Sequence, residues 1–142
     1  MNTRVMLRAS VVLLLALLLV ACADEAATRL GPQQWQDIEF VVETRPSPIR
    51  VGMNEFIVIA NREVYKPGVG LVVSLRIDDD QEWRQAIQDG FTGVYRRALR
   101  VDDPQNQSLV VHVRRAKTEG GEGNETTLSF PFSQARLIRS GS

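Results

Sequence analysis

Residues 36–44 read QDIEFVVET, and their alternating pattern is the clearest indication of the fold class. Ile38, Phe40 and Val42 recur at every second position, while acidic residues fall on the opposite parity. Because successive side chains of a strand point to opposite faces, the alternation predicts a half-buried β-strand.

Further along the chain, similar runs are separated by turn residues. The expected strands, each rich in β-branched or aromatic residues, are 55–60, 70–77, 83–87, 95–101, 108–115 and 125–133. Residues 81–88 contain no breaker, so a helical turn is the alternative to the strand at 83–87. No amphipathic helix of useful length is apparent. The spacing predicts an all-β, immunoglobulin-like antiparallel β-sandwich of about seven strands, preceded by an N-terminal signal helix.

The first 21 residues have the layout of a secretory signal. Arg4 and Arg8 precede an apolar run over residues 11–21, which ends in small residues. A membrane-spanning helix needs about 20 apolar residues, and this run is shorter. We therefore expect a signal peptide over residues 1–21 rather than a permanent span.

The sequence LVAC at 19–22 resembles the lipobox of bacterial lipoproteins, in which a peptidase cuts between Ala21 and Cys22 after the thiol has received diacylglycerol. The resemblance implies a lipid on Cys22 and attachment of the mature chain to a membrane, facing the periplasm. Ala23, rather than Asp, follows the cysteine, which by resemblance to enterobacterial sorting favours the outer over the inner membrane. The alternative is an ordinary signal peptide cut near Ala21 or Ala23, which leaves a soluble periplasmic protein.

Composition and the positions of breaker residues predict one folded domain. Residues 22–34 are small and polar with a Gly-Pro breaker, so we expect a flexible tether there, a sandwich over 35–135 and a polar tail over 136–142. The 142 residues carry 17 cationic and 17 acidic side chains, which gives no electrostatic warrant for nucleic-acid binding. One cysteine and one histidine exclude an intramolecular disulfide framework and most zinc sites.

Gly93 and Tyr95 stand at the start of a late strand. This spacing resembles the tyrosine corner of immunoglobulin-like domains, in which the hydroxyl bonds to nearby backbone. We therefore expect a structural role for both residues rather than a catalytic one.

Three segments in order, PSP at 46–48, VGMNEFIV at 51–58 and GVY at 93–95, resemble the YtkA-like and FixH-like periplasmic domains. These are small immunoglobulin-like sandwiches, often lipid-anchored, and the resemblance extends from about Ile38 to Phe132. It implies copper handling or assembly of respiratory oxidases. Residues 78–82, DDDQE, stand where many members carry Met and His.

The residues themselves point to no cofactor, metal or catalytic group. Met53, His112 and Cys22 are soft ligands of the kind that copper(I) prefers, but their spacing does not pair them. We interpret His112 as a surface histidine, and the acidic run 78–80 as a solvated turn rather than a calcium site. No Ser/His/Asp arrangement is visible, and a hydrolase would need an acidic cleft that the sequence does not disclose.

Ile57, Ile59 and Val72 fall on the outward parity of runs that we expect to be adjacent strands. We predict that they form an apolar patch covered by a partner or a second copy; the alternative is cover by the tether or a loop. The pairs 96–97 and 114–115 are interpreted as solvated arginines, with a basic stripe as the alternative. The sequence thus favours a non-enzymatic interaction module of the cell envelope with a protein partner. Metal handling is the alternative.

Overall fold

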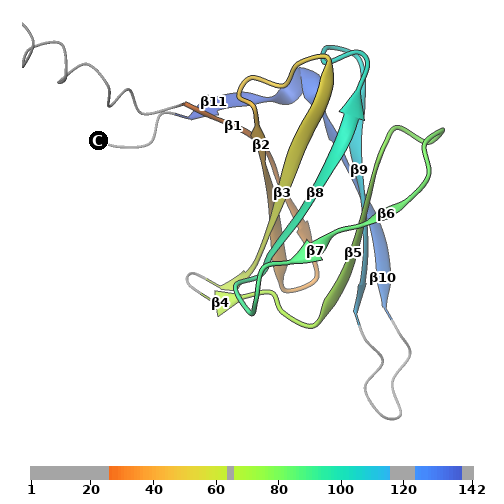
Figure 1. Cartoon of the computed structure of the whole chain (residues 1–142). Helices are drawn as coiled ribbons and strands as arrows, with labels where there is room; N and C mark the ends of the chain where they lie inside the picture. Colours follow the sequence, from red (N-terminus) through yellow and green to blue (C-terminus); the bar gives the residue numbers. More distant parts are fainter. Residues whose placement is uncertain (1–25, 64–65, 116–123, 139–142) are drawn as a thin grey trace, which may run out of the picture.

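The computed structural model describes residues 26–63, 66–115 and 124–138, whose strands form two facing sheets (Figure 1). The strands are β1 (Ala27–Trp35), β2 (Ile38–Arg45), β3 (Gly52–Glu63), β4 (Lys66–Pro67), β5 (Leu71–Ile77), β6 (Arg84–Gln85), β7 (Ile87–Gln88), β8 (Val94–Val101), β9 (Ser108–Arg115), β10 (Glu125–Pro131) and β11 (Arg136–Ile138). A 3-10 turn, η1 (Phe132–Gln134), precedes β11.

The strand order confirms the predicted immunoglobulin-like sandwich. The first sheet has the order β11-β1-β2-β3-β8-β7, with β4 also on β3, and the second has the order β10-β9-β5-β6. Every pairing is antiparallel. Counting from β2, these orders match the A-B-E-D and G-F-C sheets of an immunoglobulin domain, and β1 and β11 extend the first sheet. The predicted signal helix lies outside the described residues.

The core lies between the sheets and follows the alternation of the sequence. Ile38, Phe40 and Val42 are fully buried, as are Val111 and Val113 on the facing sheet. The η1 turn closes one part of this core, because the Phe132 ring stacks on that of Phe56 with centroids 5.9 Å apart. Burial of such side chains contributes about 1.5 to 3 kcal/mol each, which makes the sandwich the scaffold for any site.

The prediction of a flexible tether over residues 22–34 is wrong for residues 27–34, which belong to β1. Leu30 is 1% exposed and pairs with Val42 of β2. The breaker Gly31-Pro32 misled the prediction, because it occupies a register shift in the strand instead of ending it. Residues 22–25 lie outside the described part of the chain.

The predicted C-terminal tail also begins as a strand. Residues 136–138 form β11 on the edge of the first sheet, paired with β1. All three of its side chains are exposed, so the strand lacks the apolar alternation that would announce it. Residues 139–142 lie outside the described residues.

Residues 83–88 form neither one strand nor a helical turn. Instead β6 pairs with β5 in the second sheet, and β7 pairs with β8 in the first. Between them Ala86 is buried, and its amide donates to the Val73 carbonyl at 2.8 Å. The segment thus crosses from one sheet to the other and closes this side of the sandwich only in part (Figure 1).

Gly93 and Tyr95 have the predicted structural role. The buried Tyr95 hydroxyl donates to the Gly68 carbonyl at 3.0 Å, in the connection that leads from the first sheet into the second. Gly93 has φ +74, and a Cβ there would lie 2.5 Å from the Ala60 carbonyl oxygen. The arrangement differs from the usual tyrosine corner, because β8 takes the place of strand E rather than F, and the acceptor lies 27 positions upstream.

Candidate functional site

The open edge of β8 is the feature on which a site can be built. The strand pairs with β3 from Val94 to Val101 but with β7 only at Tyr95 and Arg96. The Asp89 amide donates to the Val94 carbonyl at 2.8 Å, so the backbone of Val94 faces β7. Alternate residues of an antiparallel strand face the same side, so Ala98 and Arg100 present their N–H and C=O groups beyond the end of β7.

The backbone groups at this edge are sparsely occupied. In the described residues, Gln81 reaches the Arg100 carbonyl with its side-chain amide at 3.4 Å. That distance is beyond the usual range of an N–H···O hydrogen bond, so the contact is weak. No strand of the described residues pairs with Ala98 on this side.

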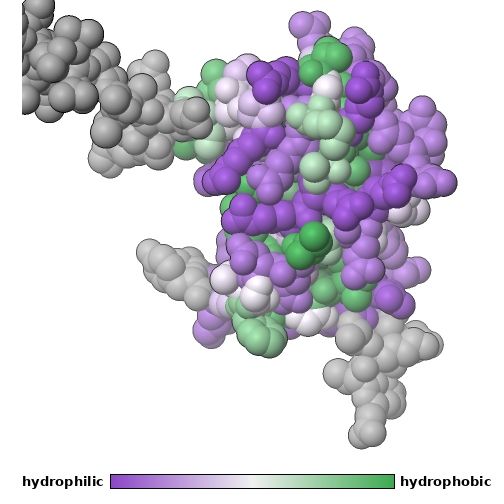
Figure 2. Space-filling model, viewed as in Figure 1, coloured by the Kyte–Doolittle hydropathy of each residue, from purple (hydrophilic) through white to green (hydrophobic). Residues whose placement is uncertain are grey.

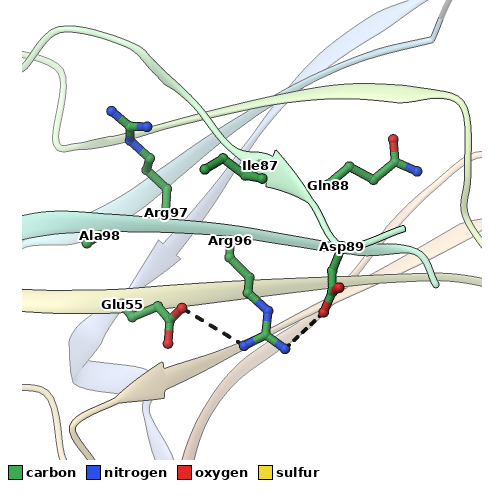
Figure 3. Close-up of a pocket in the computed structure, with 7 residues that line it drawn as sticks. All are labelled: Glu55, Ile87, Gln88, Asp89, Arg96, Arg97 and Ala98. Carbon is green, nitrogen blue, oxygen red and sulfur yellow. Dashed lines mark hydrogen bonds and ion pairs between the residues drawn. The ribbon is translucent and has the colours of Figure 1, made fainter. Parts of the chain in front are cut away.

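Two hollows lie along this edge. The first, about 570 Å³, is lined by Glu55, Ile87, Gln88, Asp89, Arg96, Arg97 and Ala98 (Figure 3). The second, about 500 Å³, is lined by Met53, Gln81, Glu82, Arg84, Arg97, Ala98, Leu99 and Arg100. Because Arg97 and Ala98 line both, we treat the hollows together as the β8-edge groove.

The arginines of the β8-edge groove differ in their partners. Arg96 is held between two carboxylates, at 3.9 Å from Glu55 and 3.2 Å from Asp89 (Figure 3). Arg100 and Arg84 likewise lie 3.1 Å and 3.4 Å from acidic neighbours on their own segments. These exposed or half-exposed pairs neutralise charge more than they stabilise the fold.

Arg97 is the exception. It shares the parity of the buried Tyr95 and Leu99, and its register partner on β3 is the buried Phe56. The side chain leaves β8 on the opposite side from Arg96 (Figure 3). Within the described residues this half-buried side chain has no carboxylate in ion-pair range, so its guanidinium is open to an anionic ligand.

Apolar side chains border the groove. Ile87 is 69% exposed at one end and Met53 is 58% exposed at the other. Figure 2 shows apolar patches separated by hydrophilic side chains on the side of the molecule that carries β7 and β8. The groove therefore combines backbone hydrogen-bonding groups, an unpaired cation and small apolar surfaces.

The predicted patch of Ile57, Ile59 and Val72 does not exist as one surface. Strands β3 and β5 belong to different sheets, so the two isoleucines lie on the outer face of the first sheet and Val72 on that of the second. Ile57 is also only 5% exposed, because its register neighbours Glu43 and Arg96 flank it and their stems cover it.

Met53 and His112 are not brought together. Met53 lies on the outer face of the first sheet and His112 on that of the second, with the core between them. The His112 imidazole instead packs against the Trp83 ring at 5.6 Å and lies 3.4 Å from Glu125. In the described residues no group of three His, Cys, Asp or Glu is placed to hold a metal ion. Cys22, with its predicted lipid, lies outside those residues.

The acidic run 78–80 shapes a turn, as predicted. Asp78 has φ +50, and its carboxylate accepts the Ser108 amide at 2.8 Å. Asp79 binds Arg76, which also stacks over the Trp83 ring at 4.2 Å. These contacts tie the end of β5 to β9.

The two arginine pairs do not form one stripe. Arg96 and Arg97 belong to the first sheet, whereas Arg114 and Arg115 belong to the second. Arg115 binds Asp37 at 2.8 Å, and this hydrogen bond holds the pKa of Asp37 below its ordinary value. The contact therefore joins the two sheets.

Comparison with protein-family models, curated proteins and solved structures finds no match for this chain. In the parts of the chain that the structure describes, no helix has the length and apolar character needed to cross a membrane. The lipobox and the YtkA-like and FixH-like resemblance remain predictions from the sequence.

Proposed function

We propose that this protein is a lipid-anchored, non-enzymatic interaction module of a bacterial cell envelope, held through Cys22 and facing the periplasm. The β8-edge groove is the observation that supports the binding role. The anchor rests on the lipobox residues 19–22, and the preference for the outer membrane rests on Ala23.

The chemistry of the groove favours binding over catalysis. It offers backbone amides and carbonyls at Ala98 and Arg100, an exposed Ile87, and guanidinium groups that donate hydrogen bonds and accept none. Of its carboxylates, Glu55 and Asp89 face Arg96, and Glu82 faces Arg84. Such groups are better suited to binding an extended chain than to proton transfer, and binding is what an interaction module requires.

The anchor is tested by the intact mass of the protein extracted from membranes. A diacylglyceryl mass on the wild-type chain, absent from Cys22→Ser together with membrane attachment, is the expected result. An unmodified wild-type chain in the soluble fraction would contradict the anchor and make Cys22 a free thiol again.

The binding role is tested by photo-crosslinking in intact cells. A photoreactive residue at Ala98 should capture a discrete envelope protein, while the same residue at Thr127, exposed on the outer face of the second sheet, should not. Equal capture at both positions, or capture at neither, counts against a partner at the groove.

A further inference from the structure

We infer that the β8-edge groove binds an extended, acidic segment of a partner protein as an added β-strand along residues 97–101 of β8. This inference rests on the proposed function and deepens it by naming the chemistry of the partner. Three features of the described residues carry it: the direction of the backbone groups, the unpaired Arg97 and the distribution of like charge.

The backbone supplies the template. β7 already pairs with β8 at Arg96 and stops there, so a segment that continues the line of β7 would meet the N–H and C=O groups of Ala98 and Arg100. Hydrogen bonds between main chains give such strand addition its affinity and are indifferent to sequence. The weakly bound Gln81 amide would leave the Arg100 carbonyl to the incoming strand.

Side chains supply the specificity. In an added strand, alternate side chains would turn inward beside Arg97 and outward beside Ala98. The inward position favours a carboxylate, because Arg97 is half-buried and has no acidic partner among the described residues. The outward position favours an aliphatic side chain, because Ala98 is small and Ile87 lines the same hollow. The preferred segment therefore alternates acidic and aliphatic residues.

The charge on this strand disfavours a second copy of the chain. Pairing β8 with β8 of another molecule along this edge would bring Arg97 of both copies to one seam, and Arg97 has no acidic partner among the described residues. Like charges opposed across strands destabilise pairing. An inward-pointing charge on an edge strand also opposes unplanned edge-to-edge association. A carboxylate in the partner segment turns this same obstacle into a selective contact.

The test uses the full chain, isotope-labelled and held in detergent micelles, and two synthetic peptides of alternating Thr and Val. One peptide has Glu at its centre and the other has Lys. We expect the Glu peptide to shift the amide resonances of Ala98 and Arg100 saturably and to slow their hydrogen exchange. The Lys peptide should bind about fivefold more weakly, as expected for loss of one half-exposed ion pair.

Variants at Arg97 decide whether the preference arises there. Arg97→Glu should reverse the order of the two peptides, Arg97→Gln should remove the difference, and the control Arg114→Glu should leave it unchanged. Thermal unfolding checks that each variant is folded. Shifts confined to other surfaces, a preference that survives Arg97→Glu, or protection of Ala98 by self-association would each overturn the inference.

The outcomes separate this inference from the proposed function. If neither peptide binds while crosslinking at Ala98 still captures an envelope protein, the added strand is wrong and the interaction module stands. If both experiments fail, both are wrong. Saturable binding with the Arg97-dependent preference supports both.

Discussion

The two halves of β8 differ in how their backbone groups are paired. Tyr95 and Arg96 are paired on both sides, by β3 and by β7, and Tyr95 is buried. Residues 97–101 are paired by β3 alone within the described residues and carry the unpaired Arg97. One end of the strand thus helps to hold the sandwich together, and the other end has an open edge to which a further strand can pair. The difference arises because β7 is only two residues long.

Among the substitutions considered, Gly93→Ala, just before the doubly paired end of β8, should cause the largest loss of stability. The new Cβ would lie 2.5 Å from the Ala60 carbonyl oxygen, at a φ of +74 that side chains resist. We expect a loss of about 4 kcal/mol in the free energy of unfolding, measured by denaturant titration. The matched control is Gly90→Ala, where φ is +56 and nothing lies within 4 Å, so that only about 1 to 2 kcal/mol should be lost. Equal losses would show that Gly93 has no special place.

Proline substitutions at positions 97 and 98 distinguish residues of β8 that face β3 from those that face the open edge. The Gly93 carbonyl accepts the Ala60 amide, so odd-numbered residues of β8 face β3 and even-numbered ones face the edge. Arg97→Pro should therefore remove a ladder hydrogen bond and cost about 3 kcal/mol, while Ala98→Pro should cost about 1 kcal/mol. Chemical denaturation measures both. Comparable losses would mean that the N–H of Ala98 is not at the open edge.

Tyr95→Phe removes only the hydroxyl group that donates to the Gly68 carbonyl. The buried Gly68 carbonyl would lose its donor, at a cost of about 1 to 3 kcal/mol. Desolvation raises the pKa of Tyr95 above 10, against a backbone hydrogen bond from Leu71. Its contribution is then fully present below pH 10, the unfolded value, and is lost as the pH rises through the higher folded-state pKa.

The raised pKa of Tyr95 predicts how stability depends on pH. The wild-type chain should lose more stability than Tyr95→Phe as the pH rises above about 10. Parallel unfolding midpoints of the two chains across this range would contradict a buried, neutral tyrosine in the folded state.

Much of the fold could be predicted from local pattern, and the site could not. Alternation such as that of Ile38, Phe40 and Val42 reports burial directly, so the two-sheet sandwich follows from it. Strand β11 and the sheet-crossing segment 83–88 were missed, because their pairing depends on distant partners and leaves no period in the sequence. The patch of Ile57, Ile59 and Val72 failed for the related reason that parity places a residue on a face but not on a sheet.

The β8-edge groove had one signal in the sequence. Arg97 lies on the same parity as Tyr95 and Leu99, and a charge on an inward parity is unusual unless the strand lies at an edge. Nothing local, however, says that β7 begins only at Ile87 or that Glu55 and Asp89 both turn to Arg96. Those facts depend on which strands lie side by side.

Hydrogen exchange of two amides on β8 shows whether the edge of this strand is open. Arg96 and Ala98 lie on the same strand and face the same side, but Arg96 is paired with Ile87 of β7 and Ala98 has no such partner in the described residues. In the full chain without peptide, an open edge predicts slow exchange at Arg96 and fast exchange at Ala98. Equal protection of the two amides would contradict it, because the edge of β8 would then already be occupied.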